Sequence, residues 1–526
     1  MRQSDRGVTS ARLRLSRPGI PSTVGLLLGL GAAVAVLGPL GFLTWQGLIH
    51  EGLAPLTRLA RQMNLVLVIG QVALLATLTT AWAIALGVPL AFLTARADLR
   101  GKNLVRWLAP LPLAVPPYIG ALVYQIVVGR PLYGVLGAAF VLGLFTYPYV
   151  YLLVGAALER SNPALEEAAR AAGLRPHQVI FRVTLPLLRP ALLASGLMVF
   201  LYGWADFGVV SLLRVRTLTT IIYDYVQGTM DWALPAGLSV LLSALTILIL
   251  FVQISTLGRG SYTQIGSSTR SPRALSLGRW QWVGIGYTAL VLCLALALPV
   301  GVLLAQATRL GPRTLALFLA GQSPFFWNSL WTAMAGATLA ILTALAVGWL
   351  EERRRQGFGI SHLFQVGYAI PGTVLGLGML GFFHAIAPWL YATPLILVLG
   401  YLVLYITPAC QATKAALAQL HPSLEEVARG LGQRPIPIFF KITLPLIRPG
   451  LVGGWLLVFI LCARELAATL ILRPAGFDTI PVRIWIYTMD VGPEPRAATL
   501  ALALVALIAI PWLVFLASQT RARFSW

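Results

Sequence analysis

Acidic residues, histidine and cysteine are all scarce in this sequence of 526 residues. It holds 17 Asp and Glu against 39 Lys and Arg, together with five histidines and three cysteines. Cys293, Cys410 and Cys462 lie in apolar stretches, match no metal or redox spacing and cannot all pair with one another. The histidines, among them His384 and His421, are scattered. We therefore expect no metal-ligating cluster and no cofactor.

A phosphate-binding loop is also missing. No segment reads Gly-x-x-x-x-Gly-Lys-Ser/Thr, so we do not expect the chain itself to hydrolyse ATP. The net charge of +22 is large, but the sequence offers no folded basic face interleaved with aromatic residues, which nucleic-acid binding requires. We expect neither an enzyme nor a nucleic-acid-binding protein, and we assign no catalytic residue.

Apolar residues, in contrast, make up 58% of the chain, and the mean hydropathy is +0.81. A soluble protein could not bury so much apolar side chain. The runs reach about 20 residues, enough to cross a bilayer as helix, and they lack the alternation of barrel strands. The sequence predicts an all-α polytopic membrane protein with about twelve transmembrane helices. They are expected at 22–45, 66–94, 104–129, 132–157, 190–214, 235–257, 281–305, 324–350, 363–386, 388–411, 450–472 and 497–517.

The basic residues predict the orientation of these helices. With both termini in the cytoplasm, the inner segments hold 28 Lys and Arg and the outer loops hold 10. This asymmetry is the one that the positive-inside rule describes. We expect a multi-pass membrane protein in contact with lipid. Its first apolar run is too long for the core of a signal peptide and is expected to remain as a helix.

The chain divides into two similar halves. Six predicted helices precede a stretch rich in Gly and Ser, and six follow it. Because an even number of crossings returns the chain to the same side, the halves have the same orientation and form parallel repeats. We predict a first module at 1–260, a cytoplasmic linker at 261–280 and a second module at 281–526.

Two polar segments are near copies of each other. Residues 163–190 align without a gap with residues 422–449, and 16 of the 28 positions are identical. The glutamates and alanines favour helix, Gly173 is placed to end that helix, and Pro176 can begin the next one. Each copy is therefore predicted to form a helix, a tight turn and a second helix. The surrounding loops are expected at 162–190 and 421–449, on the cytoplasmic side. An ordinary interhelical loop that survived duplication is the alternative.

Both loops resemble the cytoplasmic coupling motif of ABC importer permeases. That motif reads Glu-Ala-Ala, three residues, Gly, nine residues, Ile, any residue and Leu-Pro; the copies here depart from it only at Val183 and Val427. The resemblance, with the adjacent acids, marks these residues as ATPase-coupling positions: Glu166, Glu167, Ala169, Gly173, Leu185, Pro186, Glu425, Glu426, Ala428, Gly432, Leu444 and Pro445.

The resemblance implies a mechanism, partners and a location in a bacterial inner membrane. Each loop would sit in a groove of one of two copies of an ATP-hydrolysing subunit, and an external, periplasmic binding protein would deliver the substrate. The segments at 110–122 and 367–378 also look like the fused permeases of ferric-iron importers. Permeases for thiamine or another small solute are similar, and an ion-coupled secondary transporter is the alternative of a different class.

Three charged residues fall inside predicted membrane helices. They are Asp206, Arg464 and Glu465, and Asp206 and Glu465 correspond to each other in the repeat. An ionised side chain at mid-membrane costs about 2.5–3.5 kcal/mol, so it normally faces protein or a water-filled path. These residues therefore either line the transport pathway or form a structural pair. For a pair, Asp206 is the expected partner of Arg464, because neighbours on a helix point about 100° apart.

Overall fold

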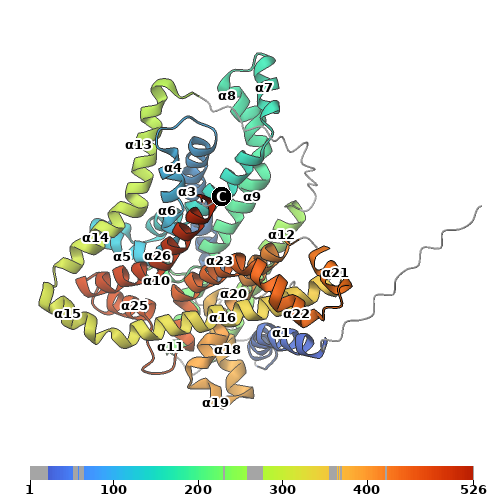
Figure 1. The fold of residues 1–526 in the computed structure, drawn as a ribbon. Helices are drawn as coiled ribbons and strands as arrows, with labels where there is room; N and C mark the ends of the chain where they lie inside the picture. The colour runs from blue at the N-terminus through green and yellow to red at the C-terminus, as the bar shows by residue number, and fades with distance from the viewer. Residues whose placement is uncertain are drawn as a thin grey trace, which may run out of the picture.

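The computed structural model describes residues 22–50, 57, 64–228, 232–257, 276–354, 364, 367, 370–420 and 423–524. Helices dominate this part of the chain, and no strand is assigned in it (Figure 1). The elements of the first half are α1 (Ser22–Thr44), η1 (Trp45–His50), α3 (Leu65–Ala95), α4 (Lys102–Leu108), η2 (Leu111–Ala114), α5 (Pro117–Val128), η3 (Arg130–Leu132), α6 (Val135–Arg160), α7 (Pro163–Ala171), α8 (Pro176–Val179), η4 (Ile180–Thr184), α9 (Leu185–Ala205), α10 (Gly208–Leu212), α11 (Leu218–Gly228) and α12 (Ala233–Leu257).

The second half repeats this order with small changes. Its elements are η5 (Gly278–Trp280), α13 (Gln281–Leu292), η6 (Cys293–Ala297), α14 (Leu298–Thr308), α15 (Pro312–Gly321), α16 (Ser323–Arg354), α18 (Gly372–Ile386), α19 (Pro388–Tyr391), α20 (Pro394–Leu417), α21 (Ser423–Gly430), α22 (Pro435–Ile438), η7 (Phe439–Thr443), α23 (Leu444–Ala463), α24 (Ala467–Leu472), α25 (Ile480–Asp490) and α26 (Pro495–Phe524). Most of the predicted linker at 261–280 lies outside the described residues.

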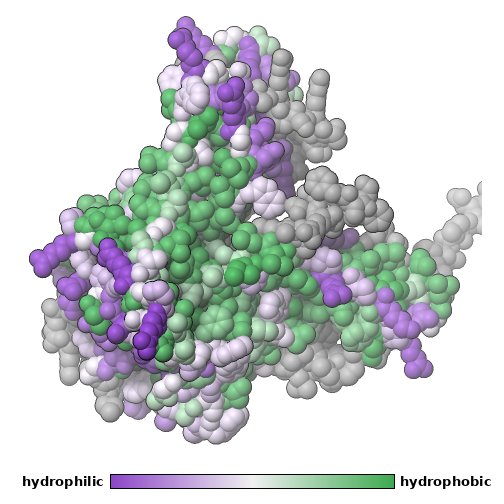
Figure 2. All heavy atoms as spheres, turned by 60° about the vertical axis from the view of Figure 1, so that its left-hand side comes forward, coloured by the Kyte–Doolittle hydropathy of each residue, from purple (hydrophilic) through white to green (hydrophobic). Residues whose placement is uncertain are grey.

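The long apolar helices confirm the all-α membrane fold. Within the described residues, nine helices are long and apolar enough to cross a bilayer. Figure 2 shows a broad hydrophobic area over the middle of the visible face, with hydrophilic side chains gathered at its top and lower left. Two further predicted blocks, 22–45 and 363–386, correspond to α1 and to α18. Helix α18 has only 15 residues.

The predicted crossing at 104–129 is not one straight helix. It is a pair of segments, Lys102–Ala114 and Pro117–Val128, bent by 93°. Val115, which precedes Pro116, has an extended backbone with φ −90° and ψ 116°. A residue before proline is driven out of the helical region by the proline ring, so the consecutive prolines break the helix here.

The same three-helix arrangement occurs in both halves. In the first half α3 packs against α6 and α9, and α6 against α9. In the second half α16 packs against α20 and α23, and α20 against α23. These bundles surround the buried core and carry the repeated polar loops between α6 and α9 and between α20 and α23.

The first helix of each half contacts the other half. Helix α1 packs against α18, α16 and α20, and its Val36 and Leu43 are almost completely buried. In return, α13 contacts α3 and α14 contacts α5. The hydroxyl of Tyr287 on α13 donates to the Leu86 carbonyl at 2.8 Å, and the hydroxyl of Tyr124 on α5 donates to the Leu294 carbonyl at 2.9 Å. The two halves are interlocked by this exchange.

Candidate functional site

The repeated loops fold as the sequence predicts. In the first loop the side chain of Asn162 accepts a hydrogen bond from the backbone N–H of Ala164 at 3.0 Å and so caps the start of α7. The helix ends in a Schellman turn, in which the N–H of Gly173 donates to Arg170 and the N–H of Leu174 donates to Ala169. Gly173 has a φ of +87°. Residues that carry a side chain rarely adopt this left-handed backbone conformation, so the turn favours glycine.

The second loop repeats this turn. The N–H of Gly432 donates to Arg429, the N–H of Gln433 donates to Ala428, and Gly432 has a φ of +80°. A Cβ added at Gly173 or Gly432 would meet nothing within 4 Å. The positive φ, rather than close packing within this chain, therefore accounts for both glycines. Ala169 and Ala428 supply equivalent acceptors in the two turns.

A π-helical turn joins each loop to its membrane helix. Helices α8 and α22 continue through η4 and η7 into α9 and α23, and Leu185-Pro186 and Leu444-Pro445 lie in the first turn after each π segment. Proline lacks the N–H that an α-helix would use, and π turns accommodate such gaps. In Figure 1, α7 and α8 form the tip at the top, and α21 and α22 lie near the right edge.

The first glutamate of each pair points into its own loop. Glu166 Oε1 accepts a hydrogen bond from the hydroxyl of Thr184 at 3.1 Å and lies 3.3 Å from the Arg96 guanidinium. Glu425 Oε1 accepts from the hydroxyl of Thr443 at 2.8 Å, which is the same contact 259 residues later. Each of these acids ties the loop helix to the segment that leads into α9 or α23.

Arg96 is a site residue that the sequence reasoning missed. It caps the end of α3, its side chain is only 2% exposed, and it also donates a hydrogen bond to the hydroxyl of Ser161. Burial lowers the pKa of Arg96, and the charge of Glu166 opposes that shift. Adding 259 to its number gives Arg355, which lies outside the described residues. Extending the repeat comparison upstream would have found this pair of arginines.

The second glutamate of each pair is exposed. Glu167 and Glu426 both face solvent on the outer side of their helices. Exposed apolar side chains accompany them at matching positions, with Leu165 41% and Leu424 47% exposed. Phe181 and Phe440 form a second matching pair, at 67% and 60% exposed. Each loop thus presents an acid and large apolar groups in the same order, a pattern that commonly marks an interaction surface.

The intramembrane carboxylates occupy matching helix breaks. Asp206 follows α9, and its Oδ2 accepts the N–H groups of Val209 and Val210 at 2.9 and 3.1 Å, at the start of α10. Glu465 follows α23, and its Oε1 accepts the N–H of Ala468 at 3.1 Å, at the start of α24. Both acids therefore cap a short helix, at positions 259 residues apart.

The expected ion pair between Asp206 and Arg464 is wrong. Both residues are described, and no ion pair joins them among the described side chains. The Arg464 guanidinium instead crosses to the first half and donates to the carbonyl of Leu113 at 2.9 Å, with the hydroxyl of Tyr149 at 3.5 Å. Backbone groups at the helix breaks replace the charge partner that the sequence suggested.

Comparison with known proteins relates both halves to one family. The model for "binding-protein-dependent transport system inner membrane component" matches residues 87–271 and 336–522. An Fe(3+)-transport system permease protein of Haemophilus influenzae is 31% identical over 449 residues, which cover 83% of this chain and 87% of that protein. A ferric transport system permease protein of Actinobacillus pleuropneumoniae is 26% identical over 74% of this chain and 62% of its own length.

Shorter relatives match a smaller part of the chain. A putrescine transport system permease protein of Escherichia coli is 31% identical over 34% of this chain and 67% of its own length. The family model, by contrast, covers most of both halves and includes both polar loops. The chain therefore belongs to the family of inner membrane components of binding-protein-dependent transport systems.

Proposed function

We propose that this chain is the permease of an ATP-driven importer, and that each of its two polar loops docks on one copy of a separate ATP-hydrolysing subunit. The observation that carries the proposal is the matching outer face of the loops. An exposed acid and exposed Leu and Phe side chains recur at the same offset, although neighbouring residues differ. A surface kept in duplicate fits a partner that is itself present in duplicate.

The internal glutamates give the loops a way to transmit movement. Glu166 links α7 to the start of α9 through Thr184 and to the end of α3 through Arg96. Hydrogen bonds to charged groups contribute about 1.5–3 kcal/mol each, so the loop and these two helices should move together. A push on α7 by the ATPase would then displace the membrane helices of that half. The modules at 1–260 and 281–526 would swing between inward-facing and outward-facing arrangements.

Ferric iron is the proposed cargo, delivered by a periplasmic binding protein. The relatives whose names specify Fe(3+) or ferric transport match about three quarters or more of this chain. The relatives named for putrescine, molybdenum and 2-aminoethylphosphonate match only about a third of it. Thiamine or another small solute remains the alternative cargo. We also propose that both termini lie in the cytoplasm.

Reconstitution tests the proposal. The chain would be placed in proteoliposomes with an ABC-type ATPase subunit and a periplasmic ferric-binding protein, and uptake of radioactive ferric iron would be followed. We expect uptake that requires ATP, the ATPase and the loaded binding protein together. Uptake driven by a proton or sodium gradient without the ATPase would instead assign the chain to the secondary transporters. ATP-driven uptake of thiamine but not of iron would replace the cargo alone.

A further inference from the structure

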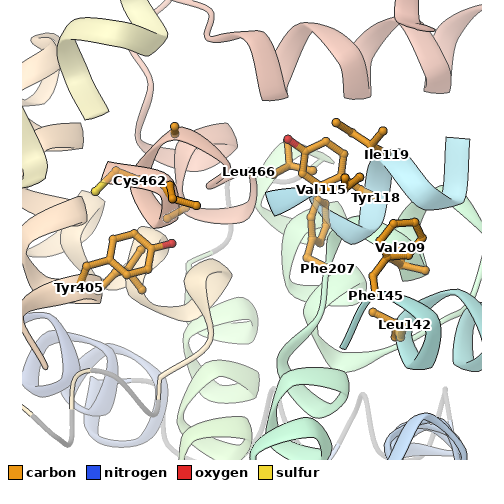
Figure 3. Packing of buried hydrophobic residues seen from close by; sticks show 14 of the residues in the cluster. Val115, Tyr118, Ile119, Leu142, Phe145, Phe207, Val209, Tyr405, Cys462 and Leu466 are labelled. Carbon is orange, nitrogen blue, oxygen red and sulfur yellow. The ribbon is translucent and has the colours of Figure 1, made fainter. Parts of the chain in front are cut away.

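Three aromatic side chains join the two halves just beyond the end of α9. Between ring centroids, Phe207 lies 4.9 Å from Tyr223 of α11, and Trp485 of α25 lies 5.5 Å from Tyr223 and 6.1 Å from Phe207. The rings of Tyr223 and Trp485 meet edge to face, at 78°, which aromatic pairs favour. In Figure 3, Phe207 lies beside Tyr118 and near Leu466 of the second half. These three rings, the aromatic cluster, are therefore a contact between the halves.

A hydrogen bond beside the aromatic cluster also crosses between the halves. The indole N–H of Trp485 donates to the hydroxyl oxygen of Ser211 on α10 at 3.0 Å. The same hydroxyl donates to the Gly208 carbonyl at 3.0 Å, so its lone pair is turned toward the indole. Helix α10 accordingly packs against α25, and α11 packs against α18 of the second half.

Tyr223 and Trp485 occupy equivalent positions in the two halves. Helices α11 and α25 both have 11 residues, and each of these two aromatic residues is the sixth of its helix. In both helices the preceding residue is Ile, and the second residue after it is Tyr. Parallel repeats are related by an axis along the membrane normal, and two equivalent residues can touch each other only near that axis. The aromatic cluster therefore lies where a passage between the halves would run.

The aromatic cluster is far from the polar loops along the membrane helix. Helix α9 begins directly after the first loop, and its 21 residues extend for about 30 Å before Phe207. The loops themselves lie apart in Figure 1, with α7 and α8 at the top and α21 and α22 near the right edge. The halves are thus joined at the end away from the loops, while the loops are separated.

We propose that Phe207, Tyr223 and Trp485 form a gate that closes the transport passage at its outer end, with the hydrogen bond from Trp485 to Ser211 as its latch. This rests on the proposed function, which places the polar loops in the cytoplasm. Apolar constrictions stop hydrated ions because they exclude water. Phe207 is 2% exposed and the other two rings are half-buried, so the cluster is such a constriction.

The helix break before Phe207 lets this gate open. Asp206 separates α9 from α10 and has an extended backbone, with φ −62° and ψ 140°. Residues at the ends of elements commonly absorb the backbone changes of a hinge movement. Helix α10, which carries Ser211, can therefore rotate against α9 without bending a continuous helix. Three ring contacts and one hydrogen bond would part as α25 moves away with the second half.

Passive leakage tests the gate without an ATPase or a cargo. The full chain alone would be placed in liposomes loaded with radioactive Rb⁺. We expect Trp485→Ala to raise Rb⁺ efflux by about fivefold or more, which corresponds to the loss of two aromatic contacts. Ser211→Ala, which removes only the latch, should raise it less. Wild-type efflux from Trp485→Ala would overturn the gate.

A matched control separates the gate from a general loosening of the fold. Trp455 stacks on Phe459 at 5.4 Å and donates to the Thr338 hydroxyl oxygen at 3.0 Å, but all three residues belong to the second half. Trp455→Ala should leave efflux unchanged, and equal leakage through Trp455→Ala and Trp485→Ala would overturn the gate. If Trp485→Ala does not fold, Trp485→Phe keeps a ring without the N–H donor and should leak as Ser211→Ala does.

Disulfide trapping tests whether the contact opens during transport. Tyr223→Cys and Trp485→Cys would be combined in a chain whose native cysteines are replaced by alanine. We expect cross-linking on oxidation of the resting importer, and cross-linking about tenfold slower when a non-hydrolysable ATP analogue holds the ATPase closed, because most molecules would then have lost the contact. The control pair, Tyr124→Cys with Leu294→Cys, joins α5 to the exchanged segment of the second half and should cross-link equally in both states.

The two experiments distinguish failure of the gate from failure of the proposed function. Equal cross-linking of the gate pair in both states, in an importer that takes up ferric iron, would overturn the gate. Leakage through Trp485→Ala in a chain that no ATPase drives would refute the proposed function while the gate stands. State-dependent cross-linking without uptake of iron would refute the cargo alone.

Discussion

Glu166 and Glu167 are adjacent in the sequence but have opposite environments, so replacing each by glutamine should separate folding from coupling. Glu166→Gln removes the charge that faces Arg96, whose side chain is 2% exposed. Breaking a buried ion pair by removing one partner costs about 3–5 kcal/mol. We expect a loss near 3 kcal/mol, the lower end, because the Ser161 hydroxyl still accepts a hydrogen bond from Arg96. Glu167→Gln removes an exposed charge and should leave stability almost unchanged.

The assay is the half-life of the folded protein in detergent at a fixed elevated temperature, read alongside the ATP hydrolysed per ion imported. A factor of ten corresponds to about 1.4 kcal/mol, so Glu166→Gln should shorten the half-life by up to roughly a hundredfold. Glu167→Gln should keep the half-life and raise the ATP consumed per ion. Because Arg96→Met with Glu166→Gln removes both charges, this double variant should recover much of the lost stability. The reasoning is refuted if Glu166→Gln is as stable as the wild type, or if Glu167→Gln is the less stable of the two.

Three further predictions address the turns, the intramembrane charges and the partners. In a Gly173→Ala, Gly432→Ala double variant, a residue with a Cβ must adopt the left-handed backbone conformation, which costs about 1–2 kcal/mol per site. Transport assays should therefore show less coupled transport. Membrane-fraction assays should show unchanged membrane insertion. Normal transport by a bulkier Gly173→Trp, Gly432→Trp double variant would argue against docking of these loops on the ATPase. Combining Asp206→Asn with Arg464→Gln should not rescue uptake, because each residue has separate partners. Recovery of uptake in the double variant would instead support an ion pair between the two residues. The chain alone in liposomes should neither hydrolyse ATP nor import iron, and either activity would remove the need for an ATPase subunit.

Local structure in the loops could be predicted because its causes are local. A short helix that begins with two glutamates, then a glycine, one further residue and Arg-Pro, is enough to indicate the left-handed turn seen at Gly173 and Gly432. The same holds for the apolar runs, whose length alone implies membrane helices. The consecutive prolines at 116 and 117 were visible too, but the 93° angle between the two segments depends on packing.

Contacts between distant segments could not be read in this way. Glu166 and Glu167 are equivalent by composition, and the positions of Arg96, 70 residues earlier, and of Thr184 give only Glu166 partners within the chain. The Asp206–Arg464 pair was inferred from opposite charges, whereas the structure meets each charge with backbone groups at helix breaks. The exchange of the first helices also leaves no signal in hydropathy, because a helix facing lipid and one facing the other half are equally apolar.

The exchanged first helix has a consequence for the order of events during synthesis. Helix α1 ends at Thr44, but its main packing partner α18 is complete only at Ile386. At a synthesis rate of about 5–20 residues per second, α1 waits on the order of tens of seconds before that partner exists. Helix α13 has no such delay, since α3 is already in place when it emerges. The nascent chain can therefore pack α12 of its own half against α1 and η1 first, and the contact that α1 makes with the other half closes only after α18 has been made.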